Sequence, residues 1–342
     1  MIDFAGIIET VWRGRGLRAR AARSALMPFE LLYRGVVGLR GALYDTGLVR
    51  VENFSVPVLS VGNLSVGGTG KTPVSAWIAH RLAERGAKPG IVLRGYGGDE
   101  TLVHERLNPG APVIVASDRA RGIREAIAQG VDIVVLDDAY QHRRASRDAD
   151  VLLLDADSWT GTARLLPAGP WREPLSAARR ANLIIVTRKI ATPIAVDEVR
   201  KAISSAAPGV PIAVAQLAPA DLRSTSTGQG LPLHVLRGSD LMAIAAVARP
   251  ESFFRQLTEL GAVVRPHSFP DHHSFTPREA NYLAAQSGSS DFVVCTLKDA
   301  VKLETIWPPE AGSLWYVSQR LKIEDGEPQI DRLLDTLLSV SR

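Results

Sequence analysis

Ser65-Val66-Gly67-Gly68-Thr69-Gly70-Lys71-Thr72 decides the fold of this chain, and it directly follows the apolar stretch Val56–Val61. The order is a buried strand, a glycine-rich turn, and a helix that opens with lysine and threonine. In such a turn, backbone N–H groups surround phosphate oxygens, the lysine neutralises the β- and γ-phosphates, and the hydroxyl binds Mg²⁺. The stretch therefore predicts a P-loop that binds a nucleoside triphosphate.

The match departs from the full pattern at one position, because Ser65 stands where the pattern has its first glycine. Gly67 and Gly68 still allow the loop to adopt positive φ angles. An ordinary glycine-rich turn between a strand and a helix is the alternative interpretation, and the Lys-Thr pair favours the phosphate site.

The composition indicates a globular protein. The chain has 342 residues, of which 46% are hydrophobic, a length suited to about two domains. The single cysteine, Cys295, cannot form an internal disulfide and lies in an apolar run, which favours a reducing compartment and a buried structural thiol. No apolar run approaches the roughly 20 residues that span a bilayer, and the N-terminus lacks the pattern of a signal peptide.

The positive charge of the chain is concentrated near its N-terminus. Residues 1–50 carry eight arginines and four acidic residues, which accounts for the whole net charge of +4. Apolar residues recur between the arginines at helical spacing, and Pro28 suits the first turn of a helix. Such a helix lies either at the surface of an anionic membrane or against its own domain with the arginines in solvent. Nucleic acid is the least favoured partner of this segment, because the charge is localised and only 6% of the residues of the chain are aromatic.

Apolar runs typical of buried parallel strands alternate with helical patterns along the rest of the chain. Residues 218–232, rich in Pro, Ser, Thr and Gly, form the expected linker. We therefore predict an α/β protein with a P-loop NTPase-type parallel sheet domain over residues 1–217, which includes membrane-associating helices over about 1–45, and a smaller α/β domain over 218–342 that closes over a cleft. The strands expected in the first domain, besides the one before the P-loop, cover 91–93, 112–116, 131–136, 151–154 and 183–186, and the first helix covers 73–85.

Carboxylates follow two of these strands. Asp137-Asp138 end the run 131–136, where ligands bind in open α/β sheets, so these side chains suit a Mg²⁺ site. A helix N-cap or a turn carboxylate is the alternative for them. Asp99-Glu100 follow a glycine turn, where one carboxylate could accept a proton and the other organise a metal, or both could belong to a solvated acidic turn.

Two loops carry further candidates. The loop 269–276 contains Asp271, His272 and His273; a histidine that supports a carboxylate base across the cleft is the functional interpretation, and a merely polar loop is the alternative. The loop 166–174 is rigid and proline-rich, and it ends in Arg172 and Glu173, which suits a wall that faces a ligand.

Taken together, these segments resemble the tetraacyldisaccharide 4′-kinases of lipid A synthesis. The resemblance runs from about residue 10 to about residue 320, and it depends on the order of many motifs rather than on one. It implies a P-loop kinase with a second α/β domain, which moves the γ-phosphoryl group of ATP to the 4′-hydroxyl of a lipid-linked glucosamine disaccharide at the cytoplasmic face of the bacterial inner membrane. The motifs are 61–73, Arg94-Gly-Tyr-Gly97, Gly98-Asp-Glu100, 136–143, 165–174, 269–276 and Lys298-Asp-Ala-Val-Lys302.

The resemblance also implies roles for single residues. Asp99 is similar to the catalytic base of the family and His272 to the histidine that pairs with it, while Lys71 steadies the β- and γ-phosphates. Thr72, Glu100, Asp137 and Asp138 correspond to the Mg²⁺ environment. The residues expected at the ATP site are Asn63, Ser65, Gly67, Gly68, Thr69, Gly70, Lys71, Thr72, Arg119, Gln141 and Glu173.

The chain departs from the family most clearly before Asp99. The family usually has a couple of dozen residues between the Arg-Gly-Tyr-Gly turn and Gly-Asp-Glu, whereas Gly97 and Gly98 are adjacent here, so Asp99 could be displaced. Leu297 also replaces a glutamate before Lys298 that is common in the family.

The resemblance favours peripheral contact of the N-terminal helices with the inner membrane, and neither nucleic acid nor an obligate protein partner is expected. A membrane-recruited P-loop ATPase switch is the alternative from another functional class. Such a switch would release phosphate to water, whereas a kinase leaves it on a lipid sugar.

Overall fold

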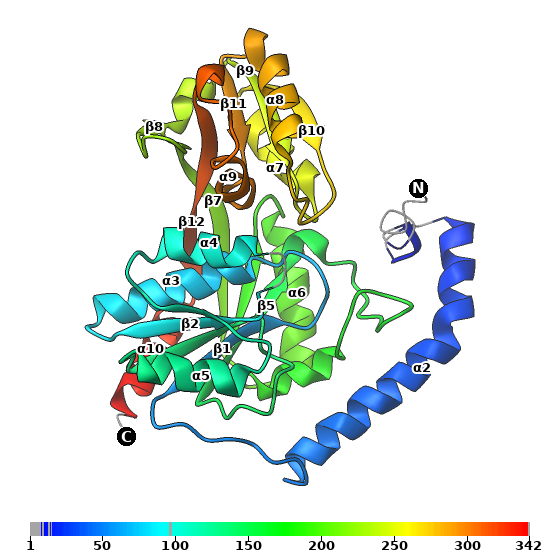
Figure 1. Cartoon of the computed structure of the whole chain (residues 1–342). Helices are drawn as coiled ribbons and strands as arrows, with labels where there is room; N and C mark the ends of the chain where they lie inside the picture. The colour runs from blue at the N-terminus through cyan, green and yellow to red at the C-terminus, as the bar shows by residue number, and fades with distance from the viewer. Residues whose placement is uncertain (1–7, 9, 13, 15, 96–97, 341–342) are drawn as a thin grey trace.

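The computed structural model describes residue 8, residues 10–12, residue 14, residues 16–95 and residues 98–340. The strands of these residues form one twelve-stranded sheet, with the order β10-β9-β11-β12-β7-β6-β5-β1-β4-β2-β3 and β8 paired to β7 (Figure 1). Neighbouring strands are parallel except at the β12–β7 and β7–β8 pairs. The α/β class is confirmed.

The part of the sheet around β1–β6, which we call the P-loop lobe, is covered on both faces. Helices α3 and α10 pack on one face, and α5 and α6 pack on the other. Strands β1, β2, β4 and β5 are buried over their whole length, which explains their near-continuous apolar sequences. The elements are β1 (Val58–Asn63), α3 (Lys71–Glu84), β2 (Pro89–Leu93), α4 (Asp99–Leu107), β3 (Val113–Val115), α5 (Arg119–Ala128), β4 (Ile133–Asp137), β5 (Ala149–Asp155), β6 (Leu183–Arg188) and α6 (Pro193–Ala206).

Residues 225–313, which we call the second lobe, extend the same sheet. Helix α7 packs on one face of its strands, and α8 and α9 pack on the other. Its elements are β8 (Gly230–Pro232), β9 (Asp240–Ala245), α7 (Pro250–Glu259), β10 (Val263–Ser268), α8 (Pro277–Gln286), β11 (Phe292–Cys295) and α9 (Leu297–Leu303). Cys295 is fully buried, as expected.

Two long strands join the lobes, namely β7 (Ile212–Ser224) and β12 (Leu314–Asp325), and they pair with each other in antiparallel register. The expected linker over 218–232 is therefore wrong for its first half, because residues 218–224 continue β7, where ladder hydrogen bonds override the local turn composition. The last helix, α10 (Glu327–Ser339), returns to the P-loop lobe and packs beside α3. The second lobe thus lies between β7 and β12 in the chain, and residues after it belong again to the P-loop lobe. A single boundary at residue 217 does not describe this order.

Helix α2 (Leu17–Asp45) is a single helix along one side of the P-loop lobe (Figure 1). Pro28 lies inside it, so the expected helix start at this proline is wrong. Most of α2 is exposed, and its only buried residues are Ala19 and Glu30. Among the described residues, no helix combines the length and apolar character that crossing a membrane requires. Phe4 and Ile7, two of the apolar residues that recur at helical spacing near the N-terminus, lie outside the described residues.

Candidate active site

The loop after β1 has the geometry of a phosphate cradle. Gly67 and Gly70 have φ values of 108° and 83°, a region that favours glycine, and Gly70 directly precedes α3. A Cβ atom on Gly70 would lie 2.5 Å from a methyl carbon of Leu217. The Lys71 ammonium folds back over the loop and donates to the Gly67 carbonyl at 3.4 Å. Thr72 follows in the first turn of α3, and both side chains line the cleft described below.

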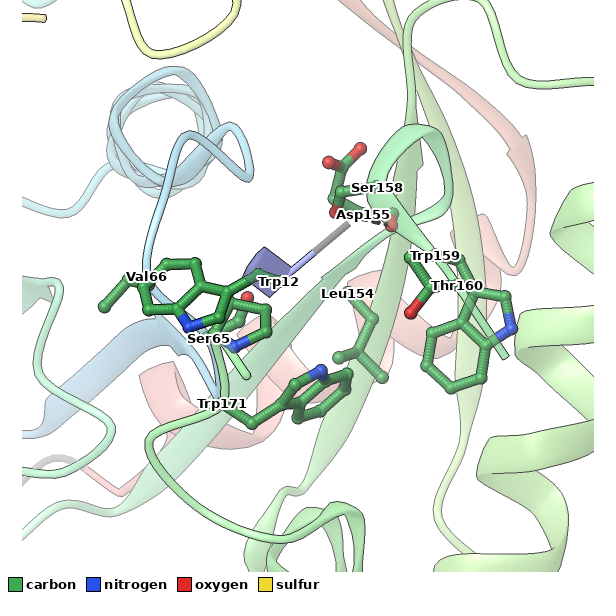
Figure 2. Close-up of a pocket in the computed structure, with 10 residues that line it drawn as sticks. Trp12, Ser65, Val66, Leu154, Asp155, Ser158, Trp159, Thr160 and Trp171 are labelled. Atoms are coloured by element: carbon green, nitrogen blue, oxygen red, sulfur yellow. Dashed lines mark hydrogen bonds between the residues drawn. The ribbon is translucent and has the colours of Figure 1, made fainter. Parts of the chain in front are cut away.

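Ser65 occupies the position where the full motif has glycine, and no positive φ is required there. Its backbone forms an antiparallel bridge with Trp171, and the next amide, of Val66, donates to the Pro170 carbonyl at 2.8 Å. Figure 2 shows Ser65 with Trp12 and Trp171 around a small pocket at the start of the loop. The loop 165–174 therefore supports the P-loop through its backbone.

Asp137 lies at the end of β4, beside the P-loop, and only 2% of it is exposed. Ser75 donates its hydroxyl to one carboxylate oxygen at 2.9 Å, and His104 Nε2 lies 2.8 Å from the other. Burial raises the pKa of Asp137, but the hydrogen bonds from His104 and Ser75 and the charge of Lys71 outweigh it, so the net shift is downward. Asp137 is thus held as a carboxylate by side chains of α3 and α4, which is not the geometry of a helix N-cap.

Asp138 lies next to the phosphate cradle in a strained backbone conformation. Its φ of 49° is in the left-handed region, which costs a non-glycine residue about 1–3 kcal/mol. The carboxylate lies 3.8 Å from Lys71 Nζ and 3.4 Å from an Arg172 nitrogen. Strain of this kind is typical of functional sites.

Asp99 and His272 come from opposite lobes and meet. His272 Nδ1 lies 3.1 Å and 3.2 Å from the two carboxylate oxygens of Asp99, and Lys302 Nζ lies 4.0 Å from one of them. Burial raises the pKa of Asp99, but the hydrogen bond from His272 and the charges of Lys298 and Lys302 lower it below its ordinary value. The same hydrogen bond raises the pKa of His272. The structure thus brings Asp99 and His272 together across the lobes, with the short segment before Asp99 in place.

The acidic pair opens a helix instead of a solvated turn. Gly98, with a φ of 75°, precedes α4, and Asp99 is only 2% exposed in its first turn. Glu100 pairs with Lys298 of α9 at 3.5 Å. Burial raises the pKa of Glu100, which Lys298 opposes and the neighbouring carboxylates Asp137 and Asp99 reinforce.

Two of the remaining predicted residues line the same cleft and two do not. Arg119 is 2% exposed and donates to the carbonyls of Ala116 and Asp137, and burial lowers its pKa. Gln141 donates to the Asn63 carbonyl at 2.7 Å. The Asn63 side chain instead supports the loop, because it donates to the Thr69 hydroxyl at 2.9 Å.

Glu173 does not line the cleft. Its carboxylate pairs with Arg180 at 2.7 Å, the residue is 6% exposed, and its amide donates to the carbonyl of Leu64, directly before the P-loop. Its expected place at the ATP site stays a prediction.

These groups surround a cavity of about 720 Å³ between the lobes. The wall from the P-loop lobe carries the glycine loop, Lys71, Thr72, Asp137 and Asp138, and the wall from the second lobe carries His272 and Lys298. Within the described part of the chain, no three His, Cys, Asp or Glu side chains gather closely enough to hold a metal on their own. A threonine hydroxyl and carboxylates are nevertheless the oxygen donors that suit Mg²⁺, which takes its other ligands from phosphate and water.

Three contacts of the cleft had no signal in the sequence. His104 touches Asp137 from inside α4. Arg249 of the second lobe pairs with Asp155 and donates to the Gly68 carbonyl of the P-loop at 3.1 Å. A lone histidine or arginine has no spacing that marks such a partner, because the partner comes from a distant part of the chain.

Helix α2 contacts the site loops through polar groups. Glu30 accepts from the Leu165 amide at 3.0 Å, Tyr33 donates to the Arg172 carbonyl at 3.1 Å, and Arg40 donates to the Gln141 carbonyl at 2.6 Å. Its apolar side chains face outward. Those exposed by more than half, besides Leu17 at the helix start, are Phe29, Leu31, Leu32, Val36 and Leu39. Apolar packing of α2 on the lobe is limited to side chains such as Ala19 and Tyr33, so most of its apolar stripe is exposed.

Comparisons with known proteins agree with this geometry. The family model described as tetraacyldisaccharide-1-P 4′-kinase matches residues 22–100 and 97–339, and the two stretches meet at the start of α4. The tetraacyldisaccharide 4′-kinase of Anaeromyxobacter sp. strain Fw109-5 is 36% identical over 97% of each chain, and that of Halorhodospira halophila is 37% identical over 91% of each. The crystal structure described as "apo" form LpxK from Aquifex aeolicus in complex with ATP has a TM-score of 0.73 and 28% identity, and covers 92% of this chain and 99% of its own.

Proposed function

The chain belongs to the tetraacyldisaccharide-1-P 4′-kinase family, and we propose that the cleft between its lobes is where the family's reaction takes place. The protein is an ATP-dependent kinase of lipid A synthesis, which phosphorylates the 4′-hydroxyl of a tetraacylated glucosamine disaccharide 1-phosphate to give lipid IVA. A membrane-recruited ATPase switch is not favoured, because relatives that match nearly the whole chain are named as kinases.

The single observation that carries the proposal is that His272, which contacts the Asp99 carboxylate, lines the cleft whose other wall holds the P-loop. The Asp99 carboxylate accepts the proton of the 4′-hydroxyl as the sugar oxygen bonds to the γ-phosphorus. The bond between that phosphorus and the β,γ-bridging oxygen breaks, and ADP leaves with the electron pair. His272 orients Asp99 and keeps it ionised.

The P-loop lobe holds the donor. Backbone N–H groups of 67–72 surround the β- and γ-phosphates, and the Lys71 ammonium, which lies over the loop, neutralises their charge. Arg119 and Gln141 lie at the same wall and orient the phosphate end of ATP. Positioning and charge neutralisation are what phosphoryl transfer mainly requires.

We assign the Mg²⁺ environment to Thr72, Asp137, Asp138 and Glu100. The oxygen donors and the proximity of Asp138 to Lys71 support this assignment. When bound, Mg²⁺ neutralises charge on the β- and γ-phosphates. Ser75 and His104 already engage both carboxylate oxygens of Asp137. Asp137 therefore suits contact with Mg²⁺ through a water molecule, and Asp138 suits direct contact.

We further propose that α2 docks the protein on the cytoplasmic face of the inner membrane. The outward apolar side chains of α2, the arginines of the same helix and the lipid nature of the substrate support this. The helix lies in the interface in this arrangement and leaves its polar contacts to the site loops intact.

The experiment is incubation of the protein with γ-labelled ATP and the tetraacyldisaccharide 1-phosphate, for wild type, Asp99→Asn and the control Glu105→Gln. Glu105 is an exposed carboxylate on the same helix as Asp99. We expect labelled lipid from wild type and from the control, and about 10²–10⁴-fold less from Asp99→Asn. Labelled phosphate without labelled lipid would overturn the kinase assignment, and an undiminished rate for Asp99→Asn would remove Asp99 as the base.

A further inference from the structure

Helix α4 is anchored almost entirely by polar groups. It has nine residues, and its buried residues are Asp99, Val103 and His104, so a single valine supplies its fully buried aliphatic contact. Its start, Gly98, has no side-chain cap. The hydrophobic effect therefore contributes little to fixing the position of this helix, and its ion pairs and hydrogen bonds must do so.

The polar contacts of α4 connect it to two different bodies. Toward the second lobe, Asp99 contacts His272, Glu100 contacts Lys298, and Arg106 pairs with Glu304 at 2.7 Å. Toward the P-loop lobe, the buried side-chain contact is that of His104 Nε2 with Asp137 at 2.8 Å. This contact joins α4, which begins with Asp99, to the end of β4 beside the phosphate cradle.

The surroundings of His104 determine which nitrogen carries the proton. The side chain is fully buried, and Nδ1 has no hydrogen-bond partner among the residues that the structure describes. A proton on Nδ1 would leave a buried donor unsatisfied, whereas a bare lone pair there costs less. The tautomer with hydrogen on Nε2 therefore fits, and it donates to the Asp137 carboxylate.

We propose that His104 is a positioning residue that fixes α4, and with it Asp99, relative to the Asp137 carboxylate at the phosphate site. Ser75 holds the other Asp137 oxygen from α3, the helix that begins with Lys71. One carboxylate thus joins the helix that holds the phosphates to the helix that holds the base. The inference rests on the proposed function for its catalytic consequence, and its structural part is independent of turnover.

The test compares His104→Leu, His104→Gln and His104→Asn. The glutamine amide nitrogen occupies the place of Nε2 and still donates to Asp137, whereas the asparagine amide is too short to reach that place. We expect His104→Leu and His104→Asn to lower kcat and the affinity for ATP with Mg²⁺ about 10–100-fold, as for other residues that orient metal-site carboxylates. His104→Gln should recover most of both quantities, and the affinity for ATP in EDTA should change little in all three.

A second readout needs neither nucleotide nor metal. In the free protein, the unfolding free energies of His104→Leu, Asp137→Asn and the double variant form a cycle, and we expect them to be clearly non-additive. Additive effects, or glutamine no better than asparagine, would overturn the proposal. Equal losses of ATP affinity with and without Mg²⁺ would also overturn it, because they indicate general damage to the fold. If Asp99→Asn proves active while the cycle is non-additive, the base assignment fails and the link between His104 and Asp137 stands.

Discussion

Replacing Leu32 and Leu39 of α2 by glutamine should release the protein from membranes. The two side chains are 68% and 64% exposed, and they lie seven residues apart on one stripe of the helix. Full burial of a leucine side chain contributes about 1.5–3 kcal/mol, so transfer of the exposed two-thirds contributes about 1–2 kcal/mol each. The double variant should lose about 2–4 kcal/mol of membrane binding, or about 30- to 700-fold in partition coefficient.

The assay is co-sedimentation with vesicles that contain anionic and neutral phospholipid, at one fixed salt concentration. The charge of the protein is unchanged, so any electrostatic attraction of the arginines to the vesicles is retained. Ile194→Gln on α6 is the control, because its side chain is 74% exposed and lies on another helix. Unfolding midpoints should not change, because the replaced groups are in solvent.

Two results would refute the reasoning about α2. The first is a wild-type protein that does not sediment with the vesicles, which would mean that the stripe has no lipid partner. The second is a loss of binding that is equally large for Ile194→Gln, which would mean that the effect does not belong to the stripe.

Three further predictions concern contacts of the cleft. His272→Ala removes the hydrogen bond that lowers the pKa of Asp99, so that pKa should rise. The acid limb of the pH–rate profile should therefore move to higher pH. A limb that stays in place would contradict this pairing. Arg249→Ala removes the ion pair with Asp155 and a hydrogen bond to the P-loop. For an interaction of about 1.4 kcal/mol, KM for ATP should rise about tenfold. An equal rise in KM for the lipid would argue against this role of Arg249. Glu30→Gln weakens the buried contact between the Glu30 carboxylate and the Leu165 amide. Hydrogen exchange over residues 17–45 should then accelerate, while the global unfolding midpoint is retained. Exchange as slow as in wild type would show that other contacts hold α2.

The parts of the fold that could be predicted are those with a strong periodic or motif signal. The P-loop and the apolar strands around it were predictable because a buried parallel strand needs apolar residues on both faces. Asp137 could be placed beside Lys71 for a similar reason, since both follow the carboxyl ends of adjacent strands. The contact between Asp99 and His272 came from the family resemblance, because nothing in their spacing of 173 residues brings them together.

The parts that could not be predicted depend on partners from distant elements. The sequence of α4 has little apolar character, so its nine-residue helix was missed, and its position depends on ion pairs with α9 and on His104. The periodicity of α2 shows an apolar stripe, but the same stripe suits packing and solvent exposure equally well. The inward face turned out to be the polar one, and it donates to and accepts from the backbone of loops more than 100 residues away.

The pairing of β7 with β12 also bears on how such a chain could have been assembled. Ser224 and Trp315 are cross-strand partners, and the Thr225 amide donates to the Leu314 carbonyl at 2.9 Å, so the chain leaves and re-enters the ladder at neighbouring points. Everything between them is an excursion from a hairpin, and a short turn could close that hairpin. The last helix then completes the core that the first strands began, beside α3. The lobe that brings His272 therefore has the topology of an insertion, because its removal at the ladder would leave the hydrophobic core beneath the phosphate cradle uninterrupted.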